Sequence, residues 1–138
     1  MKAYFSRRYQ VSASHRLHSD ALSPDENRAT FGKCNNPHGH GHNYFIEVTV
    51  GGEVDAATGM VVNMVELDSV VNKQVIERFD HMNLNLDSLF TERVSTTENL
   101  CIAVHGLLKE ALLPAILERV RIEETENNFF EYSGEVAG

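Results

Sequence analysis

The sequence is poor in cysteine and in positive charge. Its 138 residues contain two cysteines, Cys34 and Cys101, which is too few for a disulfide framework. Lysine and arginine together number 12 against 20 acidic residues, so the formal net charge is −8. Because a phosphate backbone binds to basic surfaces, this balance argues against nucleic acid as the main partner. A small anionic ligand, held by a few local cations or a metal, remains compatible with it.

Long apolar segments are also lacking. No run approaches the roughly 20 residues of a membrane-spanning helix, so no membrane partner is expected. The opening residues, MKAYFSRRYQVSASH, do not contain the apolar centre of a signal peptide. We therefore expect a cytoplasmic protein. A chain of this length, with 42% hydrophobic residues, suffices for a single domain over residues 1–138 with its own core.

Two segments alternate between apolar and polar residues, as half-buried strands do. The first covers residues 2–16, and its inward positions are Phe5, Tyr9, Val11, Ala13 and His15. The second covers residues 42–53, and its inward positions are Tyr44, Ile46, Val48 and Val50. Residues 17–39 between them are polar and rich in turn formers, so a long loop is expected there.

The second half of the chain predicts two helices and two more strands. Asn63 with Glu66, and Ser95 with Glu98, have the spacing of a capping box, and each pair precedes a stripe of apolar residues with helical period. Residues 79–90 between the helices are expected to form a loop, and strands are expected near 118–125 and 128–133. The order predicts an α+β fold, with a four-stranded antiparallel sheet and both helices on one face.

The segment CNNPHGHGHNY, residues 34–44, contains the densest group of metal-binding side chains. His40 and His42 are two residues apart, so in an extended chain they point to the same side. His15 ends the inward phase of the first strand, and all three imidazoles converge if the two strands pair. Three neutral imidazoles with one open position describe a catalytic zinc site. The alternative is a turn with surface histidines. His38 has the same phase as His40 and His42, but Pro37 indicates that the chain there is still a loop, so His38 is not included among the ligands.

The two cysteines have different surroundings. Cys34 lies in a polar loop beside Lys33, where a nearby cation can stabilise the thiolate. It is either a reactive thiol close to the metal or a fourth ligand that would make the zinc site structural. Cys101 lies inside the second helical stripe and is interpreted as a packing residue.

Two further positions carry groups suited to acid–base chemistry or binding. Asp80 precedes His81, and a carboxylate beside an imidazole can fix its tautomer; the alternative is a cationic histidine at the end of a helix. Glu124 shares the phase of Val120 and Ile122 in the third long strand. A carboxylate on the apolar face needs a partner or a ligand, unless the strand has reached solvent by that point.

Five segments, in order and over nearly the whole chain, resemble the 6-pyruvoyl-tetrahydropterin synthase family: SASHRLHS, FGKCNNPHGHGHNY, DHMNLNLD, STTENL and EETENN. The resemblance implies the tunnelling fold, in which sheets of several subunits close into a barrel, and a homohexamer built as a dimer of trimers. It also implies a zinc lyase that converts 7,8-dihydroneopterin triphosphate to 6-pyruvoyl-tetrahydropterin and releases triphosphate, a step of tetrahydrobiopterin synthesis.

The resemblance assigns roles to residues by matching motifs. The zinc ligands are His15, His40 and His42. The catalytic thiol is Cys34, and its partners in proton transfer are Asp80 and His81. The pterin pocket is formed by Thr96, Thr97 and Glu124, and Glu98 either joins them or serves only its capping box. Arg16 and Lys33 are the candidates for holding the triphosphate.

Two rival functions use the same motifs. A 6-carboxy-tetrahydropterin synthase of the queuosine pathway takes the same substrate and zinc, but its cysteine typically lies closer to the H-x-H motif than Cys34 does here. A non-catalytic zinc module would use Cys34 as the fourth ligand, and it would leave the DH and EETENN segments without a role.

Overall fold

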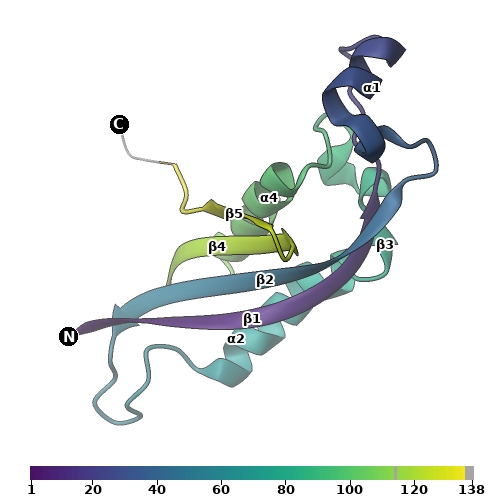
Figure 1. Ribbon diagram of the computed structural model, residues 1–138. Helices are drawn as coiled ribbons and strands as arrows, with labels where there is room; N and C mark the ends of the chain where they lie inside the picture. The colour runs from purple at the N-terminus through teal and green to yellow at the C-terminus, as the bar shows by residue number, and fades with distance from the viewer. Residues whose placement is uncertain (114, 136–138) are drawn as a thin grey trace.

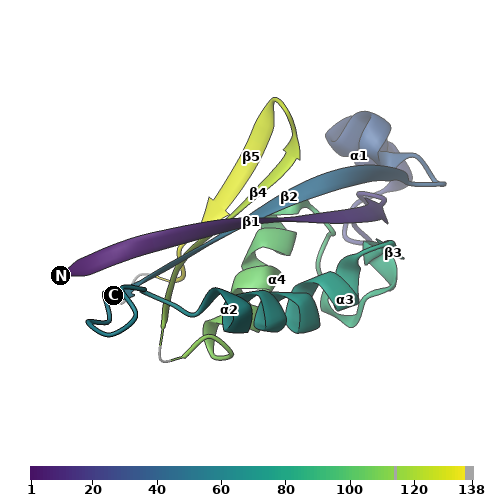
Figure 2. The ribbon, with the colours of Figure 1, turned by 90° about the horizontal axis from the view of Figure 1, so that it is seen from below.

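A computed structural model describes residues 1–113 and 115–135 of the chain. They form one five-stranded mixed sheet with helices against one of its faces (Figures 1 and 2). The strands are β1 (Lys2–His15), β2 (His40–Glu53), β3 (Met82–Asn83), β4 (Ile116–Thr125) and β5 (Asn128–Tyr132). Their order is β3-β1-β2-β4-β5, and all neighbours are antiparallel except β3, which runs parallel to β1.

Four strands of the sheet are as predicted, and the fifth, β3, was not predicted. Met82 pairs with Ala13 and Asn83 with Ser14, inside the segment that was expected to be a loop. Because β3 is only two residues long, it has no alternation that a sequence pattern could reveal. It nevertheless gives β1 a partner on its outer edge.

The long pairing of β1 with β2 positions the histidines. The ladder runs from Lys2 opposite Glu53 to His15 opposite His40. The predicted alternation is confirmed, since Val11, Ala13 and His15 are buried while their neighbours are not. Strand β2 begins at His40, two residues before its predicted start, so both residues of the H-x-H motif lie in regular strand.

Two long helical segments cover the apolar face of the sheet. The first begins with α2 (Met64–Val71), capped by the Asn63 side chain, and continues through a π-helical turn (Asn72–Ile76) into α3 (Glu77–Phe79). The second is α4 (Thr97–Lys109). Its cap is Thr96, whose hydroxyl accepts the Asn99 N–H, so the predicted capping box of Ser95 with Glu98 is wrong by one residue. Ser95 is instead buried in the loop that precedes the helix.

The expected loop over residues 17–39 contains a helix, α1 (Pro24–Phe31), followed by a 3₁₀ turn (Gly32–Asn35). Ser23 and Glu26 form a complete capping box, with Pro24 at the first helical position. Figure 1 shows α1 beyond the paired ends of β1 and β2. The excursion therefore lies next to the histidine end of the sheet.

The two faces of the sheet differ in what covers them. Figure 2 shows α2, α3 and α4 on one side of β1 and β2, where the core packs. Asp68 of α2 links the two layers, because it accepts hydrogen bonds from the Arg7 guanidinium (2.7 and 3.1 Å) and the Tyr9 hydroxyl (2.6 Å). Among the described residues no helix covers the opposite face, which carries the Arg8–Glu123 ion pair. None of the described helices has the length and apolar character needed to cross a bilayer.

Candidate metal centre

Three histidines converge where β1 ends and β2 begins. The Nε2 atoms of His15 and His40 lie 3.0 Å apart, and the ring of His42 lies 5.2 and 4.8 Å from those two rings, centroid to centroid. Two imidazole nitrogens bound to one tetrahedral zinc ion are separated by roughly 3.3 Å, given Zn–N bonds of about 2.05 Å. The spacing that β-pairing imposes on His15 and His40 is therefore close to the one a shared cation needs.

Glu124 is the fourth member of this group. It lies on β4 in the inward phase, as predicted, and its side chain is only 15% exposed. Its Oε1 atom lies 3.1 Å from His42 Nε2 and 3.9 Å from His15 Nε2. One ligand atom from each of the four residues lies within 4.8 Å of the others. The side chain that completes the group is thus a carboxylate and not the Cys34 thiol.

The protonation of the histidines suits a metal. The Nδ1 atom of His15 is 2.6 Å from the Ser95 carbonyl oxygen, an acceptor, so Nδ1 carries the hydrogen and Nε2 faces the group. Burial lowers the pKa of His15 and of His42, which favours the neutral, metal-binding form. His40 Nδ1 is buried without a hydrogen-bond partner among the described residues, and His42 Nε2 has only the 3.1 Å approach of Glu124 Oε1, which lacks the geometry of a hydrogen bond. Buried polar atoms are rarely left so, and a cation would satisfy His42 Nε2.

Tyr44 forms the floor of the group and was not identified from the sequence as a site residue. Its side chain is fully buried, and its hydroxyl lies 3.4 and 3.5 Å from the two ring nitrogens of His15. Burial, and then the Glu124 carboxylate, raise its pKa. The available signal was a tyrosine in the inward phase, two residues after His42.

The remaining residues expected in the pterin pocket differ in their placement. Thr97 is buried, and its hydroxyl has no hydrogen-bond partner among the described residues. The Thr96 hydroxyl is engaged in the helix cap, and Glu98 is exposed in the first turn of α4. Of the residues expected in this pocket, Glu124 is the one with a contact to the histidines within the described chain, and Thr97 is buried at the start of α4.

The cysteines lie in a turn and in the core. Cys34 is half-buried in the 3₁₀ turn and is a free thiol. Cys101 is buried on α4 with its Sγ 3.2 Å from the Val120 carbonyl oxygen, and burial raises its pKa to about 12. The interpretation of Cys101 as a packing residue is confirmed.

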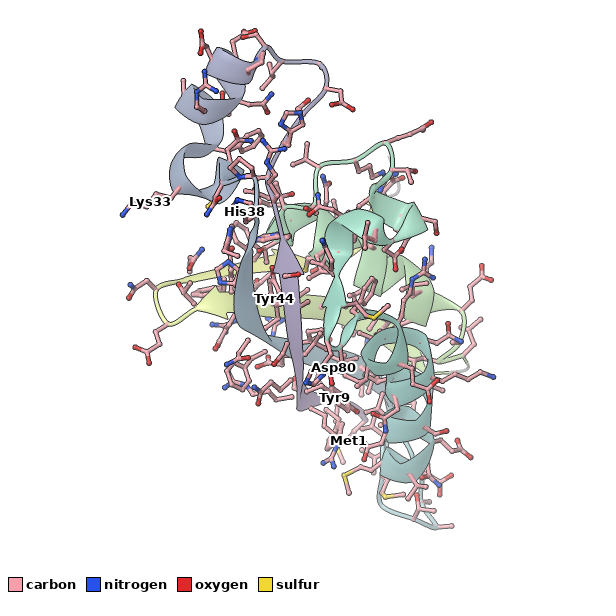
Figure 3. The ribbon with its side chains drawn as sticks, turned by 90° about the vertical axis from the view of Figure 1, so that its right-hand side faces the viewer. Met1, Tyr9, Lys33, His38, Tyr44 and Asp80 are labelled. Carbon is pink, nitrogen blue, oxygen red and sulfur yellow. The ribbon has the colours of Figure 1, made fainter. Side chains whose placement is uncertain are left out.

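Asp80 and His81 lie on the outer edge of β1. The Asp80 carboxylate accepts the Ser12 N–H (2.8 Å), which lowers its pKa, and its other oxygen lies 3.1 Å from His81 Nδ1. His81 has a left-handed backbone (φ 61°), and its side chain is 82% exposed. Figure 3 shows Asp80 well apart from Lys33, the neighbour of Cys34. Within the described chain, no contact joins this pair to the thiol.

Arg16 and Lys33, the two cations expected to hold the triphosphate, also differ in their placement. Arg16 follows His15 directly and lines a hollow of about 500 Å³ together with His18, His38 and Arg93. Lys33 is exposed, and Figure 3 shows it pointing away from the rest of the chain. Only Arg16 is placed beside the metal group.

Comparisons with known proteins agree over nearly the whole chain. A family model described as 6-pyruvoyl tetrahydropterin synthase matches residues 4–135. The chain is 47% identical to the 6-pyruvoyl tetrahydrobiopterin synthase of Homo sapiens over 135 residues, which are 97% of this chain and 93% of that protein. It is 36% identical to a putative 6-carboxy-5,6,7,8-tetrahydropterin synthase of Archaeoglobus fulgidus over 92 residues, 67% of this chain and 73% of that one. The solved 6-pyruvoyl tetrahydropterin synthase of Caenorhabditis elegans superposes with a TM-score of 0.94 at 44% identity, covering 98% and 97% of the two chains.

Proposed function

The chain belongs to the 6-pyruvoyl tetrahydropterin synthase family, and we propose that it is the lyase that converts 7,8-dihydroneopterin triphosphate to 6-pyruvoyl-tetrahydropterin with release of triphosphate. The observation that carries the proposal is the convergence of three imidazoles with Glu124 beside them. Similarity over the full chain to pyruvoyl-type synthases, against two-thirds of it to the carboxy-type relative, favours the pyruvoyl product.

His15, His40 and His42 are the residues that would hold zinc. Their donor set fits that ion, because neutral imidazole nitrogens are among its preferred ligands and burial lowers the pKa of His15 and of His42. When bound, zinc supplies Lewis acidity to the hydroxyl groups of the substrate side chain. The reaction needs this acidity because it moves protons between carbon and oxygen with no net oxidation.

Glu124 and Thr97 would bind the pterin ring. A pterin presents two parallel N–H donors, from a ring nitrogen and the amino group, and a carboxylate can accept both at once. The Oε2 atom of Glu124 already accepts one N–H donor, from the Asn128 amide at 3.0 Å. Thr97 adds a buried hydroxyl that has no partner among the described residues. Thr96 and Glu98 support this wall through the cap and first turn of α4.

The proton transfers are assigned to Cys34, Asp80 and His81. The Cys34 thiolate would take a proton from a side-chain carbon of the substrate, and His81 would exchange protons on the opposite side of that chain. Asp80 holds the His81 ring through the 3.1 Å contact with Nδ1. The elimination then releases triphosphate, for which Arg16 and its hollow are better placed than Lys33.

An oligomer would bring these groups together. His81 is exposed at the β3 edge, and β5 forms the other edge of an open sheet. Open edges and an uncovered polar face favour closure of several sheets into a barrel, in a dimer of trimers. In such an assembly His81 of one subunit would serve Cys34 of the next. The two free cysteines are in keeping with a cytoplasmic location for the enzyme.

Product analysis tests the function. The zinc-loaded protein is incubated with 7,8-dihydroneopterin triphosphate, and the products are identified by mass spectrometry. We expect 6-pyruvoyl-tetrahydropterin and inorganic triphosphate. Formation of 6-carboxy-tetrahydropterin would instead assign the chain to the queuosine-pathway reaction. Absence of turnover by a zinc-loaded hexamer would overturn the lyase assignment.

Mixed oligomers test the shared site. Cys34→Ala and His81→Ala are each expected to be inactive alone. Unfolding and refolding them together would restore part of the activity if the two residues act across subunits. Mixtures that stay inactive, while refolded wild type recovers, would place both residues in the site of one chain.

A further inference from the structure

Asn35 is a buried amide inside an otherwise exposed turn. It is 6% exposed, whereas its neighbours Lys33 and Asn36 are exposed and Cys34 is half-buried. A buried amide is costly unless its groups are hydrogen-bonded. Asn35 therefore needs partners that the turn itself does not provide.

Those partners lie on the segment that follows β1. The Asn35 Nδ2 atom donates to the Leu17 carbonyl oxygen at 2.7 Å, and the Leu17 N–H donates to the Cys34 carbonyl oxygen at 2.8 Å. In addition, Arg16 Nε donates to the Asn35 carbonyl oxygen at 3.1 Å. Both main-chain polar groups of Leu17 are thus bonded to the turn that carries the thiol, two residues after His15.

The other end of the loop lies against the last residue of β1. Gly39 has φ 74°, and a Cβ atom there would lie 3.1 Å from the His15 carbonyl oxygen, so only glycine fits without displacement. His40 follows directly and pairs with His15. Residues 34–39 are therefore held at one end by the segment that follows β1 and at the other end by His15, the last residue of β1.

We propose that Asn35 is a positioning residue, which holds the Cys34 thiol at the metal centre by bonding its turn to Leu17. This inference rests on the proposed role of Cys34 in the reaction. Within the described chain no contact joins the side chain to the metal group, although its Nδ2 also lies 3.4 Å from Nδ1 of His18, which lines the hollow beside Arg16. Its effect on the reaction would be transmitted through the position of the thiol.

The test measures the thiol directly. The rate of Cys34 alkylation by iodoacetamide is followed against pH, by mass spectrometry of the Cys34 peptide, with and without bound zinc. In the wild-type protein, a nearby zinc cation is expected to shift the alkylation profile toward lower pH. In Asn35→Ala the shift should largely disappear while zinc content stays at the wild-type level. Turnover should fall about 10- to 100-fold with little change in KM, because small displacements of a reacting group have effects of this size.

Asn36→Ala is the matched control, since it removes the same amide one residue later. That amide is exposed, and its oxygen accepts only the His38 N–H within the loop, at 3.2 Å. The control should keep the zinc-dependent profile. Asn35→Asp keeps the volume but replaces the donor that faces Leu17, so it provides a second variant if the alanine variant does not fold.

Each result has one meaning. A zinc-dependent profile that persists in both Asn35 variants overturns the positioning role, whatever the activity of the enzyme. A profile lost in those variants, in a protein that never converts the pterin triphosphate, supports the positioning role and overturns the function instead. A wild-type profile that ignores zinc would show that the thiol is not held near the metal, and the inference would be wrong.

Discussion

The ring of His15 is held by the main chain of Ser95, eighty residues further along the sequence, through an Nδ1–O contact of 2.6 Å. The carbonyl group fixes the tautomer, so the lone pair of Nε2 points to His40. Because the acceptor belongs to the backbone, replacement of the Ser95 side chain leaves it in place. The same loop leads into α4 and Thr97, so one segment both orients a histidine of the group that could hold a metal and begins the helix.

Removing a histidine should remove the metal, and removing the thiol should not. We expect His40→Ala to lose zinc and activity together, because three imidazoles converge in the described part of the chain and two would leave the ion underligated. Cys34→Ala should retain zinc at the wild-type stoichiometry while its turnover falls by at least about 100-fold. Zinc content after dialysis, measured beside kcat for both variants, checks this. Loss of zinc from Cys34→Ala would make the thiol a ligand and the site structural.

Replacement by alanine should lower the stability at Gly39, in the loop, and raise it at Gly106, in helix α4. Gly39→Ala places a Cβ 3.1 Å from the His15 carbonyl oxygen in a left-handed conformation, which costs about 1–2 kcal/mol of stability. Gly106 is exposed on α4 with open space around it, so Gly106→Ala should add about 0.5–1 kcal/mol. Urea midpoints at one fixed protein concentration measure both. A Gly39→Ala protein as stable as wild type would contradict the tight contact.

Much of the fold follows from local pattern. Strict alternation predicts β1 and β2, and their pairing alone brings His15 opposite His40. The helix α1 was also encoded locally, by Ser23, Pro24 and Glu26, but the polar composition around it indicated a loop. The two-residue β3 carries no periodic signal at all.

The alternation in the sequence identifies Glu124, but its place beside the histidines depends on the register between β2 and β4. Ile46 pairs with Ile122, which places Glu124 beside the start of β2, and the ladder shifts at a bulge after Thr49. A bulge changes which residues face one another without altering the alternation on either side of it. The sequence likewise identifies Asp80 and His81 as a pair. It could not place them at the outer edge of β1, because that position depends on a long-range pairing and not on a local pattern.

Acid should destabilise the protein through His105. This side chain is 5% exposed, packs against the Tyr132 ring at 4.9 Å and lies close to Gly134; its Nε2 has no hydrogen-bond partner among the described residues. Burial, and then the charge of Lys109, lower its pKa below 6.5 in the folded protein. The unfolded chain thus binds the proton more readily, so stability is full above pH 6.5 and is lost as the pH falls toward the folded pKa.

Unfolding by urea at pH 7.5, 6.5 and 5.5 measures this loss in zinc-loaded protein, where the metal keeps His15 and His42 deprotonated. His105→Phe retains an aromatic ring against Tyr132 but cannot be protonated. Its stability should fall less between pH 7.5 and 5.5 than that of the wild type. Equal slopes in the two proteins would assign the acid sensitivity to other groups.

Glu124→Gln separates pterin binding from metal binding. The substitution keeps the size of the side chain but replaces one acceptor with a donor, which would face a donor of the pterin. A hydrogen bond to a charged group contributes roughly 1.5–3 kcal/mol. Its loss, with the mismatch added, should raise KM at least about tenfold. Glu123→Gln is the control, since Glu123 pairs with Arg8 at 2.8 Å on the opposite face of the sheet.

The zinc content of the same two variants decides between the roles open to Glu124. Its carboxylate lies 3.1 Å from His42 Nε2, close enough to be either a fourth ligand or a neighbour of the metal. If Glu124 anchors the pterin and is not a ligand, the Glu124→Gln variant should bind zinc like the wild type and lose only substrate affinity. If it loses zinc to the extent of His40→Ala, the carboxylate is a ligand, and the pterin must be bound elsewhere. If Glu123→Gln raises KM as much as Glu124→Gln does, then the pterin is bound from the opposite face and the proposed pocket is wrong.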